Sequence, residues 1–138
     1  MNLNPELVRT RCQEIEESLG RLEKIKAVKK EDFLKDRDLQ DIACYRLLVA
    51  IEAALGLCYH VSAKHLKRVP EEYAECFAIL SDAQIVPKEL SETLQRMARF
   101  RNLLVHMYWK LDYPAVYDLI QHQLVDLRRF SEAIVSRL

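Results

Sequence analysis

The sequence contains few residues that break helices. Its 138 residues include two glycines and four prolines, and both glycines, Gly20 and Gly56, lie inside helical hydrophobic patterns. No stretch alternates polar and apolar residues between turn signals, as a half-buried strand would. No internal repeat is present either. These absences exclude a β-rich or repeat architecture, and the length fits one all-α domain spanning residues 1–138.

Cysteine motifs and net charge are also missing. The four cysteines are far apart and form no CxxC pair, so we expect small core side chains in a reducing compartment: Cys12, Cys44, Cys58 and Cys76. The 21 basic and 21 acidic residues cancel. No global field therefore attracts nucleic acid or an anionic membrane, and a polyanion would need a local basic patch.

The N-terminal segment does not resemble a targeting sequence. The stretch "MNLNPELVRTRCQEIEESL" is amphipathic and rich in acidic residues, unlike a secretory leader. No uninterrupted apolar run reaches the length that a membrane span requires. We therefore expect a cytoplasmic protein without a membrane partner.

Helical periodicity predicts an antiparallel bundle of four to five helices. Asn4 before Pro5 and Asp112 before Pro114 are typical helix starts, and Asp36 or Asp38 can cap a long second helix. Short connections between long helices favour antiparallel packing. The expected helices cover residues 5–27, 38–66, 71–83, 87–111 and 114–137, with a helical turn near Phe33 in the first connection.

The stretch "RNLLVHMYW", residues 101–109, places two polar residues in an apolar helical segment. At about 100° per residue, the segment has a core stripe of Met97, Phe100, Leu104, Met107 and Leu111. The opposite stripe is polar and consists of Arg99, Asn102, His106 and Lys110. Arg101 and Tyr108 would share a third face. Because neither Arg101 nor His106 belongs to the core stripe, we expect both to be dispensable for folding.

Arg101 and His106 point about 140° apart on an ideal helix. They can meet only through the length of the arginine, if the helix ends near His106, or if a second copy of the chain supplies one of them. The last possibility favours a site at a dimer interface. Asn102, four residues before His106, can reach its imidazole. Glu52, in the apolar run "VAIEAALGL", is a candidate partner for Arg101 or an edge residue in water.

Each of these residues also has an ordinary structural interpretation. A histidine on a polar helix face is commonly just solvated, and an arginine beside a core commonly extends its charge to water. Tyr108 fits the rim of a core. Trp109 could stack on a base or fill a dimer interface. His60 and His65 do not have the spacing of HExxH and are interpreted as surface or packing residues, and no acidic cluster suggests a metal site.

The motif Arg-x4-His-x-Tyr, formed by Arg101, His106 and Tyr108, resembles the signature of HEPN-domain proteins of the HepT-like group. The resemblance extends from about residue 36 to the C-terminus. It includes "RDLQDIACYRLLVAIEAALGLCYHV", which is similar to the long second helix of the group, and the flanking "VPKEL" and "MARFRN". The bare RxxxxH pattern is weak, but its combination with Tyr108 and these flanking segments is specific.

This resemblance implies an all-α homodimer that acts as a metal-independent endoribonuclease toxin without a cofactor. Its motif would lie at the dimer interface. The partner would be an MNT-type nucleotidyltransferase antitoxin, which attaches AMP to the motif tyrosine, here Tyr108. The alternative is a non-catalytic HEPN module for dimerisation or nucleotide binding that partners a nucleotidyltransferase.

The motif residues suit RNA cleavage because RNA carries its own nucleophile, the 2′-OH. Histidine ordinarily titrates near neutrality, so His106 can serve as general base or acid. The planar fork of Arg101 matches phosphate oxygens, and Asn102 would orient His106 or donate to phosphate. Further candidate RNA contacts are Arg96, Arg99, Trp109 and Lys110.

Overall fold

The computed structural model describes residues 2–138 and confirms the all-α prediction. The described chain contains seven α-helices and one 3₁₀ turn. In chain order these are α1 (Pro5–Lys26), α2 (Lys30–Phe33), α3 (Arg37–Lys64), α4 (Tyr73–Asp82), α5 (Lys88–His106), η1 (Tyr108–Lys110), α6 (Tyr113–His122) and α7 (Leu124–Val135).

Three helix starts form where the sequence predicts them. The Asn4 side chain accepts hydrogen bonds from the backbone N–H groups of Glu6 and Leu7, at 3.0 and 3.3 Å. Asp36 caps α3 and Asp112 caps α6 in the same way. These caps satisfy backbone donors that have no partner within the first turn of a helix.

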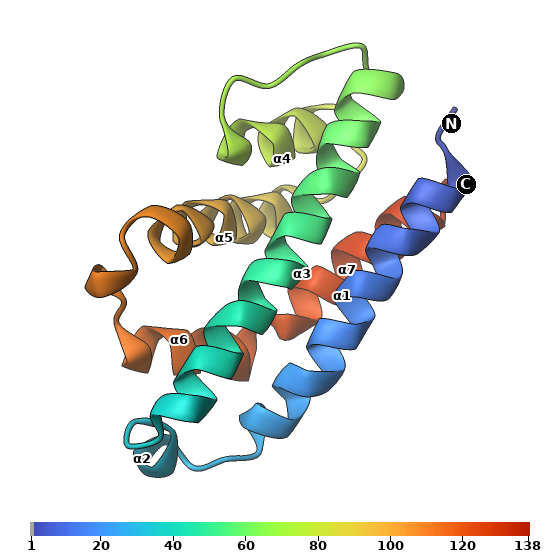
Figure 1. Cartoon of the computed structure of the whole chain (residues 1–138). Coiled ribbons are helices and arrows are strands. Elements are labelled where there is room, and N and C mark those ends of the chain that lie inside the picture. The colour runs from blue at the N-terminus through green and yellow to red at the C-terminus, as the bar shows by residue number, and fades with distance from the viewer. Residues whose placement is uncertain (1) are drawn as a thin grey trace.

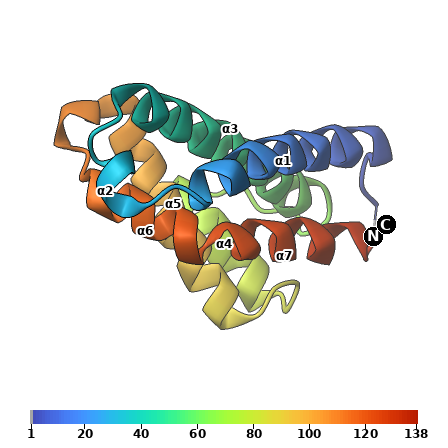
Figure 2. The same ribbon diagram turned by 90° about the horizontal axis from the view of Figure 1, so that it is seen from below.

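The long helix α3 is the centre of the bundle. In Figure 1, α1 lies along one side of α3, whereas α4 and α5 pack on the other side. Viewed from below, α6 and α7 form a second layer under α1 and α3 (Figure 2). The buried face of α3 includes small residues, Ala43, Ala50, Ala53 and Ala54, which let neighbouring helices approach closely.

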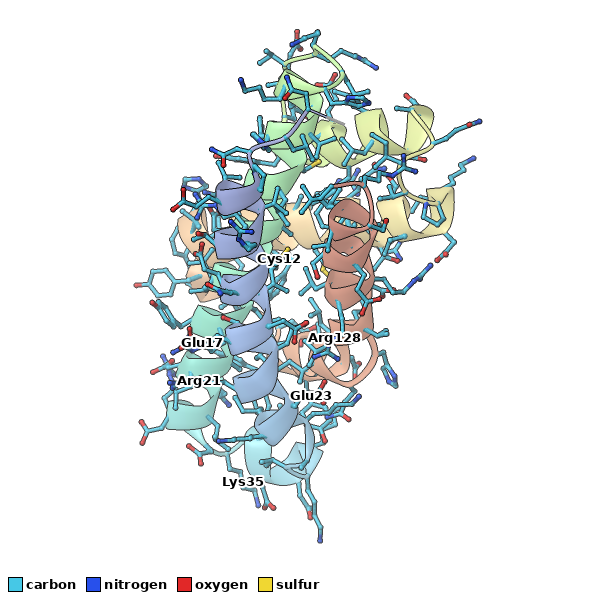
Figure 3. The ribbon with its side chains drawn as sticks, turned by 90° about the vertical axis from the view of Figure 1, so that its right-hand side faces the viewer. Cys12, Glu17, Arg21, Glu23, Lys35 and Arg128 are labelled. Atoms are coloured by element: carbon cyan, nitrogen blue, oxygen red, sulfur yellow. The ribbon has the colours of Figure 1, made fainter. Side chains whose placement is uncertain are left out.

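The C-terminal helix α7 joins both sides of the bundle. Phe130 meets Phe77 of α4 edge-on, with the ring centroids 5.4 Å apart. Arg128, on the side of α7 that faces α1 in Figure 3, forms an ion pair with Glu16 at 3.1 Å. The Ser91 hydroxyl of α5 donates to the carbonyl oxygen of Phe77 at 2.9 Å. The contacts of Phe130 and Ser91 hold the α4–α5 pair, which carries the candidate site.

The helices are more numerous than predicted because the expected final helix is divided. Gln123, with φ −120° and ψ 2°, lies outside helical geometry and separates α6 from α7. Ile120 before the break and Leu124 after it are both buried. The change in direction therefore lets two successive segments turn apolar side chains into one core. The helical turn predicted near Phe33 is present as α2.

The cysteines are free thiols within the core region, as predicted. Cys58 and Cys76 are buried, and Cys12 and Cys44 are half-buried. Burial raises the pKa of Cys58, and its hydrogen bond with Cys76 raises it further. Both effects disfavour the reactive thiolate.

The uninterrupted apolar runs of the sequence are short, but the length and overall composition of a whole helix are a separate criterion. In the described chain, α3 is the one helix that is long and apolar enough to cross a bilayer. Half of its apolar window is buried inside the bundle. A central core helix has the same composition, so this property is weak evidence for a membrane location.

Candidate functional site

Helix α5 ends at His106, and this end determines the geometry of the motif. Met107 leaves helical geometry at φ −141° and ψ 43°, and its N–H donates to the Leu103 carbonyl at 3.0 Å. A 3₁₀ turn, η1, follows and is closed by a bond of 2.8 Å from the Lys110 N–H to the Met107 carbonyl oxygen. The chain changes direction here because α6 starts a few residues later, at the N-cap Asp112.

The predicted helical run to Leu111 is therefore wrong, and so is the face shared by Arg101 and Tyr108. Tyr108 and Trp109 lie on η1 with their rings in an edge contact, at a centroid distance of 5.7 Å. Their exposed fractions are 65% and 68%. Neither aromatic side chain fills the core of the described chain, and both are accessible from solvent.

Arg101 is held by three neighbours, and its side chain is only 12% exposed. The Nε group forms an ion pair with Glu52 of α3, the partner suggested by the sequence. The Nη1 group donates to Asn102 Oδ1 at 3.2 Å. The guanidinium also lies over the Tyr73 ring of α4, at 4.5 Å from its centroid. Arg101 thus connects α3, α4 and α5.

Asn102 does not bind His106 in the described chain, contrary to the sequence expectation. Its amide oxygen accepts from Arg101 instead. The difference arises because the neighbouring guanidinium is a charged donor and forms the stronger hydrogen bond. His106 is exposed at the last position of α5.

A surface cleft of about 530 Å³ lies between α5 and the beginning of α4. Arg99, Asn102 and His106 line one wall, and Glu71, Glu72 and Tyr73 line the other. Three residues of the predicted polar stripe therefore share a cavity. Tyr73, Glu71 and Glu72 are far from the motif in sequence and were not anticipated.

The other predicted RNA contacts lie outside this cleft in the described chain. Arg96 faces a separate groove next to α6, with a volume of about 300 Å³. Lys110 is on η1 with Trp109. The four cations Arg96, Arg99, Arg101 and Lys110 therefore do not surround one groove of a single protomer, because they point to different sides of α5 or lie beyond its end.

Burial raises the pKa of Tyr59, whose ring meets Tyr73 edge-on with the centroids 6.0 Å apart. Within residues 2–138, no three His, Cys, Asp or Glu side chains converge as ligands for a metal ion.

The fold and the sequence together define the class of the protein. The family model for ribonuclease HepT-like proteins matches residues 15–134, so the chain belongs to this family.

Two curated relatives match most of this chain. An mRNA nuclease HepT of Shewanella oneidensis is 28% identical over 102 residues, covering 74% of this chain and 77% of the relative. A tRNA nuclease HepT of Aphanizomenon flos-aquae is 28% identical over 137 residues, covering 99% of this chain and 93% of the relative.

Solved structures confirm the HEPN fold. The tri-AMPylated HEPN toxin of Shewanella oneidensis, in complex with an MNT antitoxin, has a TM-score of 0.88 at 24% identity and covers 99% of both chains. A toxin–antitoxin complex with AMP-PNP has a TM-score of 0.85 at 24% identity and covers 97% of this chain and 99% of that chain.

The contacts of Arg101 predict a cost in stability, contrary to the sequence expectation that it is dispensable. Replacing Arg101 with alanine should lower the free energy of unfolding by about 1–2 kcal/mol, because stacking and packing on Tyr73 are lost. The ion pair adds little, since Glu52 is half-exposed. Urea unfolding measures the change.

Arg99→Ala is the matched control, because Arg99 is an exposed arginine on the same helix. Its effect should stay within about 0.5 kcal/mol. Equal effects of the two substitutions would show that the contacts of Arg101 do not contribute to stability.

Proposed function

We propose that this protein is a metal-independent endoribonuclease toxin whose activity depends on Arg101 and His106 and is silenced by adenylylation of Tyr108. The observation that carries the proposal is the cleft beside α5, where His106, Asn102 and Arg99 line one wall. Family membership and the curated nuclease relatives support the ribonuclease class. The whole chain acts as one domain in the cytoplasm.

His106 supplies the proton transfers of the proposed reaction. As a neutral imidazole it removes the proton from the 2′-OH, and the 2′-oxygen attacks the adjacent phosphorus. The bond from phosphorus to the 5′-oxygen breaks, and the 5′-oxygen takes a proton from the imidazolium of the second protomer. The products are a 2′,3′-cyclic phosphate and a 5′-OH, and no metal-bound water takes part.

Arg101 stabilises the phosphorane through the donors that its neighbours leave free. A guanidinium has five N–H donors. Glu52 and Asn102 engage Nε and one N–H of Nη1. The remaining donors face charge that develops on the phosphate oxygens, and their fixed direction requires no reorganisation during the reaction.

A homodimer completes this proposed site. The two helices that carry the Arg101–Glu52 pair also carry exposed apolar side chains. Ile42 and Tyr45 precede Glu52 on α3, and Val105 follows Arg101 on α5. Their exposed fractions of 47%, 59% and 40% suit an interface with a second copy better than contact with water. A symmetric dimer would also place a second set of motif residues in the groove.

The proposed partner is an MNT-type nucleotidyltransferase antitoxin. The support is the structural similarity to a tri-AMPylated toxin bound to such an antitoxin. The Tyr108 oxygen would attack the α-phosphorus of ATP, with loss of a proton and release of pyrophosphate. Because Tyr108 follows His106 by two residues, the attached AMP would obstruct the approach of RNA to the imidazole.

We predict that the purified protein cleaves single-stranded RNA in the presence of EDTA. His106→Ala should abolish cleavage with little change in helicity or melting, because His106 is exposed at a helix end. Gel analysis with end-group mapping measures the products. Activity that disappears with EDTA and returns with Mg²⁺ would overturn the mechanism, whereas full activity of His106→Ala would favour the non-catalytic module.

We predict a dimer at micromolar concentration, with residues from both protomers in each site. An equimolar mixture of Arg101→Ala and His106→Ala proteins, unfolded and refolded together, should regain part of the activity that each lacks alone. Heterodimers then hold one intact Arg101 and one intact His106 from different protomers and lack only the second imidazole, whose place as proton donor to the 5′-oxygen water can take more slowly. Light scattering gives the oligomeric state, and a monomer with full activity would exclude the composite site.

We predict that co-expression with the cognate nucleotidyltransferase adds AMP to Tyr108 and silences cleavage. Tyr108→Phe should resist silencing and keep much of its nuclease activity, because the mechanism gives the hydroxyl no proton to transfer. Tyr113→Phe, which removes the next tyrosine hydroxyl along the chain, is the matched control and should remain sensitive. Peptide mass spectrometry locates the modification, and AMP on another residue would contradict the prediction.

A further inference from the structure

The cleft beside α5 has walls of opposite charge that do not pair with each other. Arg99 lies on the α5 wall, and Glu71 and Glu72 lie on the other wall. Within residues 2–138, none of these three side chains takes part in a hydrogen bond or an ion pair. Arg101, by contrast, is engaged on several sides. The cleft therefore presents free charges of both signs to a ligand.

Two of these polar groups are not needed by the fold. Glu72 occupies the N-cap position of α4, but its side chain makes no capping hydrogen bond. The Glu75 carboxylate accepts a hydrogen bond of 2.8 Å from the backbone N–H of Glu71. The local structure before α4 therefore uses the backbone of Glu71 and not its side chain. Asn102 uses its amide oxygen for Arg101, which leaves its NH₂ group to donate into the cleft.

The dimensions and charge of the cleft suit one nucleotide. Arg99 and His106 are seven residues apart on α5, which corresponds to about 10 Å along the helix. Arg99 on α5 would attract the phosphate, whereas the carboxylates of the other wall repel it. A nucleotide bound next to His106 would therefore place its sugar and phosphate along α5 and direct its base toward Glu71 and Glu72.

We propose that Glu71 and Glu72 form a subsite that reads a guanine base next to the scissile phosphate. The inference rests on the proposed ribonuclease function and adds base selection to it. Carboxylates only accept hydrogen bonds. Guanine offers two adjacent donors, N1–H and the 2-amino group, which one carboxylate can accept in parallel. Apolar contact with the base comes from Met107 and Ala74, which also line the cleft.

The other bases fit these carboxylates less well. Adenine and cytosine each present one amino group next to a ring nitrogen that is itself an acceptor. Uracil presents its single N3–H between two carbonyl oxygens, which the carboxylates repel. Single-stranded RNA is commonly recognised through these base edges, and a good bidentate pair discriminates by roughly tenfold or more.

The test compares cleavage at unpaired guanosine and uridine in one RNA. The wild-type protein should favour guanosine by about tenfold. The double substitution Glu71→Gln with Glu72→Gln should bring the ratio close to one, because glutamine cannot accept both hydrogen bonds at once. Glu31→Gln, on α2 at the other end of α3, removes a charge away from the cleft and should leave the ratio unchanged (Figure 1).

Several outcomes would overturn the subsite. Equal cleavage at all four nucleotides by the wild-type protein is one. Preference for guanosine that survives the double substitution is another. A uniform rise in cleavage after the double substitution would show that the acidic wall only repels RNA.

Binding separates this inference from the proposed function. Fluorescence anisotropy with 2′-deoxy trinucleotides, which cannot be cleaved at this position, reports recognition without catalysis. Selective binding of the guanine-containing trinucleotide without RNA cleavage would support the subsite and contradict the nuclease proposal. Binding that does not distinguish guanine from uracil would overturn the subsite, whatever the nuclease assay shows.

Discussion

The arrangement of the candidate site depends on how Arg101 is held. Its guanidinium pairs with Glu52, contacts Asn102 and stacks on Tyr73, so one side chain connects three helices. A mostly buried cation requires such partners, because leaving water without them would be costly. The same contacts direct Asn102 and fix the start of α4 beside α5. The contacts that compensate the buried charge of Arg101 therefore also position the two walls of the cleft.

Division of labour between the motif residues follows from this constraint. Arg101 is rigid and largely covered, whereas His106 is exposed at the end of α5 and can move with its side chain. Tyr108 lies beyond the helix on a short turn, separate from the core. In the proposed function, charge stabilisation thus comes from a fixed group, proton transfer from an accessible group, and control from a third group that can be modified without disturbing the bundle.

Much of the fold could be predicted because its signals are local. Asn4, Asp36 and Asp112 cap helices where their types and positions indicate. The break at Gln123 has no proline or glycine to mark it, and the apolar period continues across it, so a single helix was predicted. The sequence did not predict the end of α5 at His106. A helix end there was only one of three ways in which Arg101 and His106 could meet.

The site was less predictable because its contacts are long-range. The motif and Glu52 were found from the sequence, but nothing near Tyr73 indicates that its ring would lie beneath Arg101. Glu71 and Glu72 resemble ordinary loop residues until α4 packs against α5. Residue spacing within a helix determines which of its faces is polar, whereas the packing of helices against one another determines which polar faces meet.

The edge contact between Phe77 and Phe130 has a consequence for synthesis of the chain. Domains emerge from the ribosome N-terminus first. A nascent chain that stops before α7 contains every residue of the cleft but lacks the aromatic ring that anchors α4 from the far side. The contacts of Arg101 still link the two walls, but α4 lacks the hydrophobic packing behind it. Truncated translation products would therefore carry the complete motif on a less stable pair of helices, and the proposed activity would be weaker in them than in the full chain.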